Sequence, residues 1–171
     1  MSSCRISFEG KDPATGKNKK EVAQANFFNF TQPKLKPYFK AEDFLTADAY
    51  LTKIGKDYFL TLEIMLRSKD ASKSYGSINL NSELRLQFVD GDESILYSIV
   101  QDYGEIEPYS GHTLYTAVYP LNNDAITYMS KKLVDTAGIM WSSGFEQYDI
   151  YQVDFLKEQM NCLKNGTYSK K

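Results

Sequence analysis

Histidine, tyrosine and acidic side chains gather between residues 97 and 113, and they are the side chains of this sequence best suited to chemistry. His112, the only histidine, could act as a general base if Asp102, Glu105 or Glu107 oriented its ring. Two carboxylates held about 5–9 Å apart could instead hydrolyse a glycosidic bond. The spacing fixes neither arrangement, and neither cysteine lies near His112 in the sequence. A hydrolase is therefore the third of our hypotheses, and we assign no catalytic residue.

The same stretch also suits the binding of a small molecule, a carbohydrate or a cation. No lysine or arginine lies between Arg85 and Lys131, but seven acidic residues do, so a cation would meet little repulsion there. The run Asp90-Gly91-Asp92-Glu93 lacks the ligand spacing of an EF-hand and predicts a hairpin turn, although Asp90 and Asp92 could still join a looser cation site. The candidate ligand-binding residues are Tyr97, Asp102, Tyr103, Glu105, Glu107, Tyr109 and His112.

Cofactor sites have little support in this sequence. No glycine-rich loop of the kind that binds nucleotides stands between a predicted strand and a predicted helix. Cys4 and Cys162 lie near opposite ends of the chain, so their spacing does not establish a bridge, and we expect free thiols. Two cysteines and one histidine do not supply the four ligands of a structural zinc site. We therefore expect no cofactor and no metal.

Charge is distributed unevenly along the chain. Residues 1–40 carry 8 basic and 3 acidic side chains, whereas residues 41–163 carry 9 basic and 19 acidic ones. The acidic body and the scarcity of arginine argue against nucleic-acid binding. Basic residues beside aromatic ones are instead typical of protein interfaces. The candidate interface residues are Phe27, Phe28, Phe30, Lys34, Lys36 and Tyr38.

The body of the chain predicts strands arranged in hairpins. The period-two alternation of apolar residues over 58–66 predicts a strand with one buried face, paired through a Gly55-Lys56-Asp57 turn with 50–54. A polar loop is expected at 68–76. Further strands are expected at 78–89, 94–101, 113–119, 137–141 and 145–151, and Ile95, Tyr97 and Ile99 are expected to face inward.

Helices are expected only near the C-terminus. Asn122 or Asn123 can cap a helix that reaches Leu133, and a last helix is expected from Asp154 to Leu163, with a left-handed stop at Asn165-Gly166. About seven strands in hairpins with two late helices predict an α+β fold with a mainly antiparallel sheet. We expect residues 1–47 to form an extended basic, aromatic arm and residues 48–171 to form the single α+β domain.

The arm is expected to lie across its own domain or across a neighbouring chain through its aromatic residues. No stretch is long and apolar enough to span a membrane, and the first residues lack a secretory signal, so we expect a cytoplasmic protein. Cys4 could be a lipidated cysteine only if an upstream signal had been removed. Our first hypothesis is a non-enzymatic interaction or assembly module, in which the basic arm pairs with an acidic sheet edge of a protein partner or of a second copy. Ligand binding by residues 102–113 is the alternative.

Overall fold

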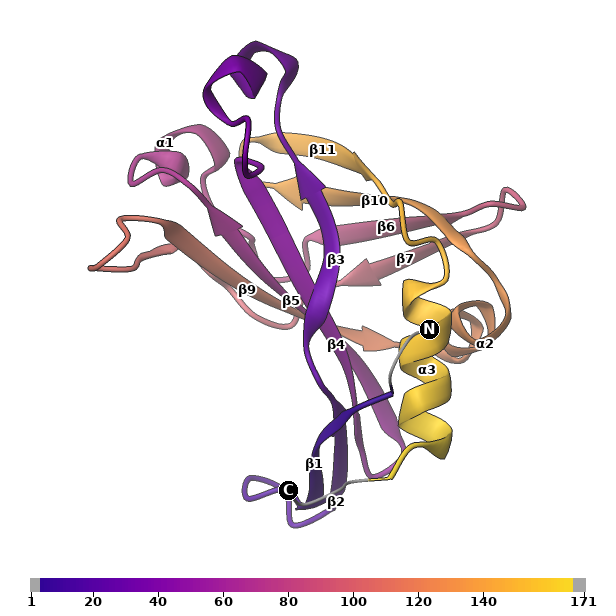
Figure 1. The fold of residues 1–171 in the computed structure, drawn as a ribbon. Coiled ribbons are helices and arrows are strands. Elements are labelled where there is room, and N and C mark those ends of the chain that lie inside the picture. The colour runs from indigo at the N-terminus through magenta and orange to yellow at the C-terminus, as the bar shows by residue number, and fades with distance from the viewer. Residues whose placement is uncertain (1–3, 168–171) are drawn as a thin grey trace.

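The computed structural model describes residues 4–167, which form two antiparallel sheets and a few helices, an α+β fold as expected (Figure 1). The larger sheet has seven strands in the order β1-β2-β4-β5-β9-β8, with β3 beside β4, and the smaller sheet has the order β11-β10-β6-β7. The strands are β1 (Ile6–Lys11), β2 (Asn18–Val22), β3 (Ala25–Phe30), β4 (Leu45–Ile54), β5 (Asp57–Leu66), β6 (Glu83–Phe88), β7 (Glu93–Tyr97), β8 (Glu105–Ile106), β9 (Thr113–Leu121), β10 (Val134–Trp141) and β11 (Gly144–Asp149).

The hairpin of β4 and β5 is the centre of the larger sheet and confirms the predicted pairing, although Asp57 belongs to β5 and not to the turn. Ile54 pairs with Asp57 across the turn, and the alternate residues Leu60, Leu62 and Ile64 of β5 are buried. The smaller sheet and helix α3 (Phe155–Asn165) pack against this buried face (Figure 1). The two sheets therefore share one hydrophobic core.

The predicted starts of the two late helices agree with the structure better than their predicted ends do. Helix α2 (Asn123–Lys131) is capped by Asn122, whose Oδ1 accepts the Ala125 N–H at 2.8 Å. A short helix α1 (Ala71–Tyr75) lies in the segment that was expected to be a loop. The left-handed stop after α3 is wrong, because Gly166 has φ −71°. Glycine is needed there for space, since a Cβ would lie 2.5 Å from Cys4 Sγ.

The predicted inward face of β7 is also wrong. Leu84 of β6 pairs with Leu96, so these two side chains share the buried face of the smaller sheet. Tyr97 and Ile99 are instead about half exposed, with exposed fractions of 52% and 50%. Small serines, Ser94 and Ser98, occupy the inward positions, so the alternation of large apolar residues misidentified the buried face.

Residues 6–30 do not form a separate arm but supply three strands of the larger sheet, β1, β2 and β3. The register of β3 against β4 shifts between Asn26 and Phe28, and this bulge lets the consecutive residues Phe27 and Phe28 both be buried. Phe28 stacks on Tyr148 of β11 with ring centroids 4.7 Å apart. Three of the candidate interface residues, Phe27, Phe28 and Phe30, therefore pack against the core of their own chain. Of the two expected positions for these aromatic residues, on the same chain or on a neighbouring one, the structure shows the first.

Candidate functional site

Asp102 lies between β7 and β8, where its carboxylate holds the backbone of its own chain. One oxygen accepts the Gly104 N–H at 2.8 Å, and the other accepts the Thr116 N–H of β9 at 2.8 Å. Gly104 has φ +85°, and a Cβ there would lie 2.7 Å from the Tyr115 ring, so both the conformation and the space require glycine. The Asp102 carboxylate is thus part of the scaffold that joins this segment to the sheet.

Glu107 closes the turn that follows β8. Its two carboxylate oxygens accept the N–H groups of Tyr109 at 3.0 Å and Ser110 at 2.6 Å, and the Ser110 hydroxyl at 2.5 Å. These hydrogen bonds, of which the one from the Ser110 hydroxyl has the largest effect, hold the pKa of Glu107 below its usual range. A carboxylate stabilised in its charged form is a poor general acid or base near neutral pH.

The ring of His112 does not contact a carboxylate in the described part of the chain. Its Nδ1 lies 3.2 Å from the sulfur of Met65 on β5, and its backbone N–H donates to the Ser110 hydroxyl. A histidine general base needs a partner that orients its ring toward a substrate. The geometry therefore lacks the orienting carboxylate that a hydrolase site at His112 would use.

The tyrosines of the candidate ligand site project from the surface. Tyr103 and Tyr109 have exposed fractions of 72% and 99%, while Tyr97 belongs to the outer face of the smaller sheet. Glu105 lies on the short strand β8 and is exposed. Ligand binding by these residues stays a prediction, because the structure brings them near one another along the chain but does not bury them around a common space.

The acids that could hold a cation contact a lysine instead. Lys132 Nζ, just after α2, donates to Asp90 Oδ2 at 2.6 Å and also to Asp92, and both acids lie in the turn between β6 and β7. The ammonium lowers the pKa of Asp90, and the two carboxylates raise the pKa of Lys132. Among residues 4–167, no group of three or more histidine, cysteine or acidic side chains is arranged to hold a metal ion.

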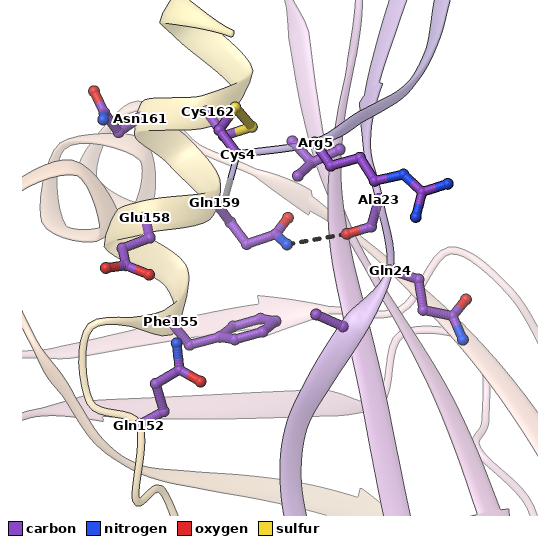
Figure 2. A pocket seen from close by; sticks show the side chains of 12 residues that line it. Cys4, Arg5, Ala23, Gln24, Gln152, Phe155, Glu158, Gln159, Asn161 and Cys162 are labelled. Carbon is purple, nitrogen blue, oxygen red and sulfur yellow. Dashed lines mark hydrogen bonds between the residues drawn. A yellow bond between two sulfur atoms is a disulfide. The ribbon is translucent and has the colours of Figure 1, made fainter. Parts of the chain in front are cut away.

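A hollow of about 610 Å³ lies between α3 and the N-terminal strands (Figure 2). Gln159 bridges its floor, because its Oε1 accepts the Leu51 N–H and its Nε2 donates to the Ala23 carbonyl, each at 3.2 Å. Figure 2 shows the charged groups of Arg5 and Glu158 pointing away from each other. The hollow thus offers polar walls but no converging pair of acid and base.

Cys4 and Cys162 form a disulfide at the rim of this hollow (Figure 2). Their Cα atoms lie 5.3 Å apart although the residues are 158 positions apart in the sequence. The expectation of free thiols is therefore wrong. The bond also uses the Cys4 sulfur that a lipid thioether would need, so this state excludes lipidation at Cys4.

The remaining candidate interface residues lie on a loop between β3 and β4, which contains the short 3-10 helix η1 (Pro33–Tyr38). None of the six residues of η1 is buried, and Figure 1 shows the loop extending beyond the end of the sheet. Lys34 and Lys36 are exposed, and Tyr38 has an exposed fraction of 79%. We call residues 33–40 the basic loop.

The base of the basic loop is fixed to the sheet. The Thr31 hydroxyl donates to Asp43 at 2.7 Å and accepts the Phe44 N–H at 2.9 Å, so the two ends of the segment are held together. Phe39 packs edge to face on Phe44 with ring centroids 5.4 Å apart. The loop is therefore presented on an ordered base, with its charged side chains outward.

Comparison with known proteins adds no assignment, because no family model, curated protein or solved structure matches this chain. No helix within residues 4–167 is long and apolar enough to cross a membrane. The structure itself defines an α+β protein of two antiparallel sheets, in which a disulfide joins the segment before β1 to helix α3.

Proposed function

We propose that this protein is a non-enzymatic assembly module in which the basic loop of one copy contacts an acidic sheet face of a second copy. The observation that carries the proposal is the basic loop itself, which presents Lys34, Lys36 and Tyr38 beyond the end of the sheet. None of its lysines forms an ion pair with an acid among residues 4–167. An exposed aromatic ring is typical of a contact surface, and the exposed cations beside it favour an acidic partner through charge complementarity.

The complementary surface is the face of β4 and β5 that points away from the core. Asp48 pairs directly with Glu63 across these strands, and strand alternation places Tyr50 on the same face. Asp48 accepts hydrogen bonds from the side chains of Gln24 at 3.0 Å and Asn26 at 3.4 Å, but these neutral amides do not cancel its charge. Like charges directly opposite each other destabilise a sheet, so a cationic partner would relieve the repulsion between Asp48 and Glu63. The pKa of Tyr50 is raised by burial and then by the charges of Glu21 and Glu63, as expected for a ring in acidic surroundings.

Ligand binding by residues 102–113 has weaker support than assembly. The carboxylates of Asp102 and Glu107 are already hydrogen-bonded to their own backbone. Nucleic acid is also disfavoured as a partner, because only three arginines, Arg5, Arg67 and Arg85, occur in the chain. We infer an oxidising compartment rather than the expected cytoplasm, since disulfides persist mainly outside reducing compartments.

A charge-reversal experiment tests the proposed assembly. Lys34→Glu/Lys36→Glu removes the basic surface, and Asp48→Lys/Glu63→Lys removes the acidic one, so each variant alone is expected to be a monomer by light scattering. An equimolar mixture retains one intact basic loop and one intact acidic face, and it is expected to form a dimer of the two variants.

Matched controls reverse exposed charges elsewhere, with Lys157→Glu on α3 and Asp135→Lys on β10. These controls are expected to assemble as the unmodified chain does. The proposal is contradicted if each double variant, measured alone, still assembles as the unmodified chain does. It is also contradicted if an equimolar mixture of the two double variants stays monomeric.

A further inference from the structure

A second hollow, of about 470 Å³, is lined by residues of β1, β2 and β4. In Figure 1, β1 and β2 lie at the end of the larger sheet opposite the basic loop. The hollow is open and lined mainly by polar and cationic residues. The lining residues are Glu9, Gly10, Asn18, Lys19, Lys20, Lys53 and Gly55. We call this feature the lysine hollow.

Two of its lysines oppose each other directly. Lys20 of β2 pairs with Lys53 of β4 in the antiparallel register, so their side chains leave the sheet on the same face. Two ammonium groups in this arrangement repel each other, as two carboxylates would. Glu9 of β1 is paired with Lys20 on its other side, whereas the residue paired with Lys53 on its other side is Tyr58 of β5, which carries no charge to balance it.

The contacts of these two ammonium groups leave their positive charges in place. Lys20 Nζ donates to the carbonyl oxygen of Gly166, at the C-terminal end of α3, which is a dipolar group rather than an anion. Lys53 Nζ lies 5.3 Å from the centroid of the Tyr58 ring. An ammonium has three donors, so Lys20 retains donors beyond the one used for Gly166.

The third lysine of the lining, Lys19, is already ion-paired, because its Nζ lies 3.6 Å from Glu21 Oε2. A further lysine, Lys17, lies beside the turn but is not part of the lining. The side chain of Lys17 crosses Gly55 in the β4–β5 turn, where its Cδ is 3.0 Å from the position that a Cβ of residue 55 would occupy. Gly55 has φ +60°, so glycine suits both this turn and the close approach of Lys17. The positive charge that the hollow offers a ligand therefore comes from Lys20 and Lys53, since Lys19 is ion-paired and Lys17 lies outside the lining.

From this arrangement we propose that the lysine hollow binds a small ligand through a phosphate or sulfate group held between Lys20 and Lys53. A doubly charged oxyanion would neutralise both ammonium groups and accept a charge-assisted hydrogen bond from each. The side chain of Asn18 and the polar backbone around Gly10 and Gly55 suit a hydroxylated body on the same ligand. This proposal does not depend on assembly through the basic loop, which lies at the other end of the sheet.

Binding is tested with inorganic phosphate, inorganic sulfate and glucose 6-phosphate as separate probes, by calorimetric titration and by the shift in Tm at constant ionic strength. The unmodified chain is expected to bind the oxyanions and to gain Tm. Lys53→Gln is expected to weaken binding by about tenfold, the effect of losing one charge-assisted hydrogen bond. Lys53→Arg keeps the charge and is expected to retain most of the affinity. Tighter binding of glucose 6-phosphate than of inorganic phosphate would show that the hydroxylated body also contributes.

The matched control is Lys56→Gln, which removes an exposed lysine from the same turn but outside the lining of the hollow. It is expected to bind as the unmodified chain does. Because Lys53→Gln removes both a repulsion with Lys20 and a cation–π contact with Tyr58, its Tm without ligand is expected to stay close to that of the unmodified chain, which separates lost binding from lost folding. Equal loss of affinity in Lys53→Gln and Lys56→Gln overturns the proposal, as does the absence of a response to all three probes. Binding to vesicles that contain phosphatidylserine, without a response to the soluble probes, would also overturn it in favour of a membrane surface.

Discussion

Loss of the Cys4–Cys162 disulfide is expected to lower the free energy of unfolding by about 2–4 kcal/mol. The bond closes a loop with a sequence separation of 158, for which the chain-entropy relation gives about 5 kcal/mol at 25 °C. Measured effects are commonly smaller than this relation predicts, because the reduced unfolded chain keeps some structure. For a chain of this length, the expected loss corresponds to a decrease in Tm of roughly 4–16 °C.

The assay is urea unfolding followed by the fluorescence of Trp141, the only tryptophan, which is 2% exposed in the folded chain. The unmodified chain is compared with and without a reductant, and Cys4→Ser/Cys162→Ser serves as the control in which reductant has no further effect. The reduced chain and the double variant are expected to share one lower urea midpoint. An unchanged midpoint on reduction, or free thiols on the purified chain by mass spectrometry, would refute the reasoning.

Three further substitutions or titrations test separate parts of the structure. Phe28→Ala is expected to lower the free energy of unfolding by about 3–5 kcal/mol, because Phe28 is 2% exposed and stacks on Tyr148. Urea unfolding measures this loss, and a loss under about 1 kcal/mol would mean that β3 does not belong to the core. Lys53→Gln is expected to change the free energy of unfolding by less than about 1 kcal/mol, because relief of the repulsion with Lys20 offsets loss of the cation–π contact with Tyr58. A destabilisation clearly above about 1 kcal/mol in the same assay would contradict that interpretation of the pair. Burial, followed by the charge of Asp102, raises the pKa of Tyr115 to about 12, which favours the neutral phenol in the folded state. The stability contributed by the neutral Tyr115 phenol is therefore complete below pH 10 and is lost as the pH rises toward 12. A urea midpoint that stays constant over this pH range would contradict the raised pKa of Tyr115.

The hairpins could be predicted because their signals are local. The alternation over 58–66 predicts the strand and its buried face, and Gly55-Lys56-Asp57 predicts the turn to within one residue. The Asn122 cap is likewise a short-range hydrogen bond. Each of these signals depends on residues that are neighbours in the sequence. The fold class followed from them.

The faces and ends that depend on distant residues could not be predicted in the same way. Ser94 and Ser98 face inward because β7 must match the register of β6, which overrides the apparent stripe that contains Tyr97. The burial of Phe27 depends on a bulge and on Phe155 of α3, 4.9 Å away between ring centroids. No local signal in the sequence carries that information.

The candidate sites show the same limit. The sequence identified Asp102 and Glu107 as acids near one another, but it could not show that backbone N–H groups already occupy their oxygens. The disulfide and the Lys20–Lys53 pair were missed because each joins residues that only the folded chain brings together. Lys34 and Lys36 could be proposed as surface residues because the surrounding prolines and lysines disfavour burial.

The native mass of the unmodified chain, measured by light scattering at about 50 mM and about 500 mM salt, tests the central claim most directly. Assembly through the basic loop and the acidic face of β4 and β5 predicts a mass above that of the 19.5 kDa monomer at low salt and a decrease toward the monomer at high salt. A mass of 19.5 kDa at both salt concentrations would contradict the proposal that this chain assembles with itself.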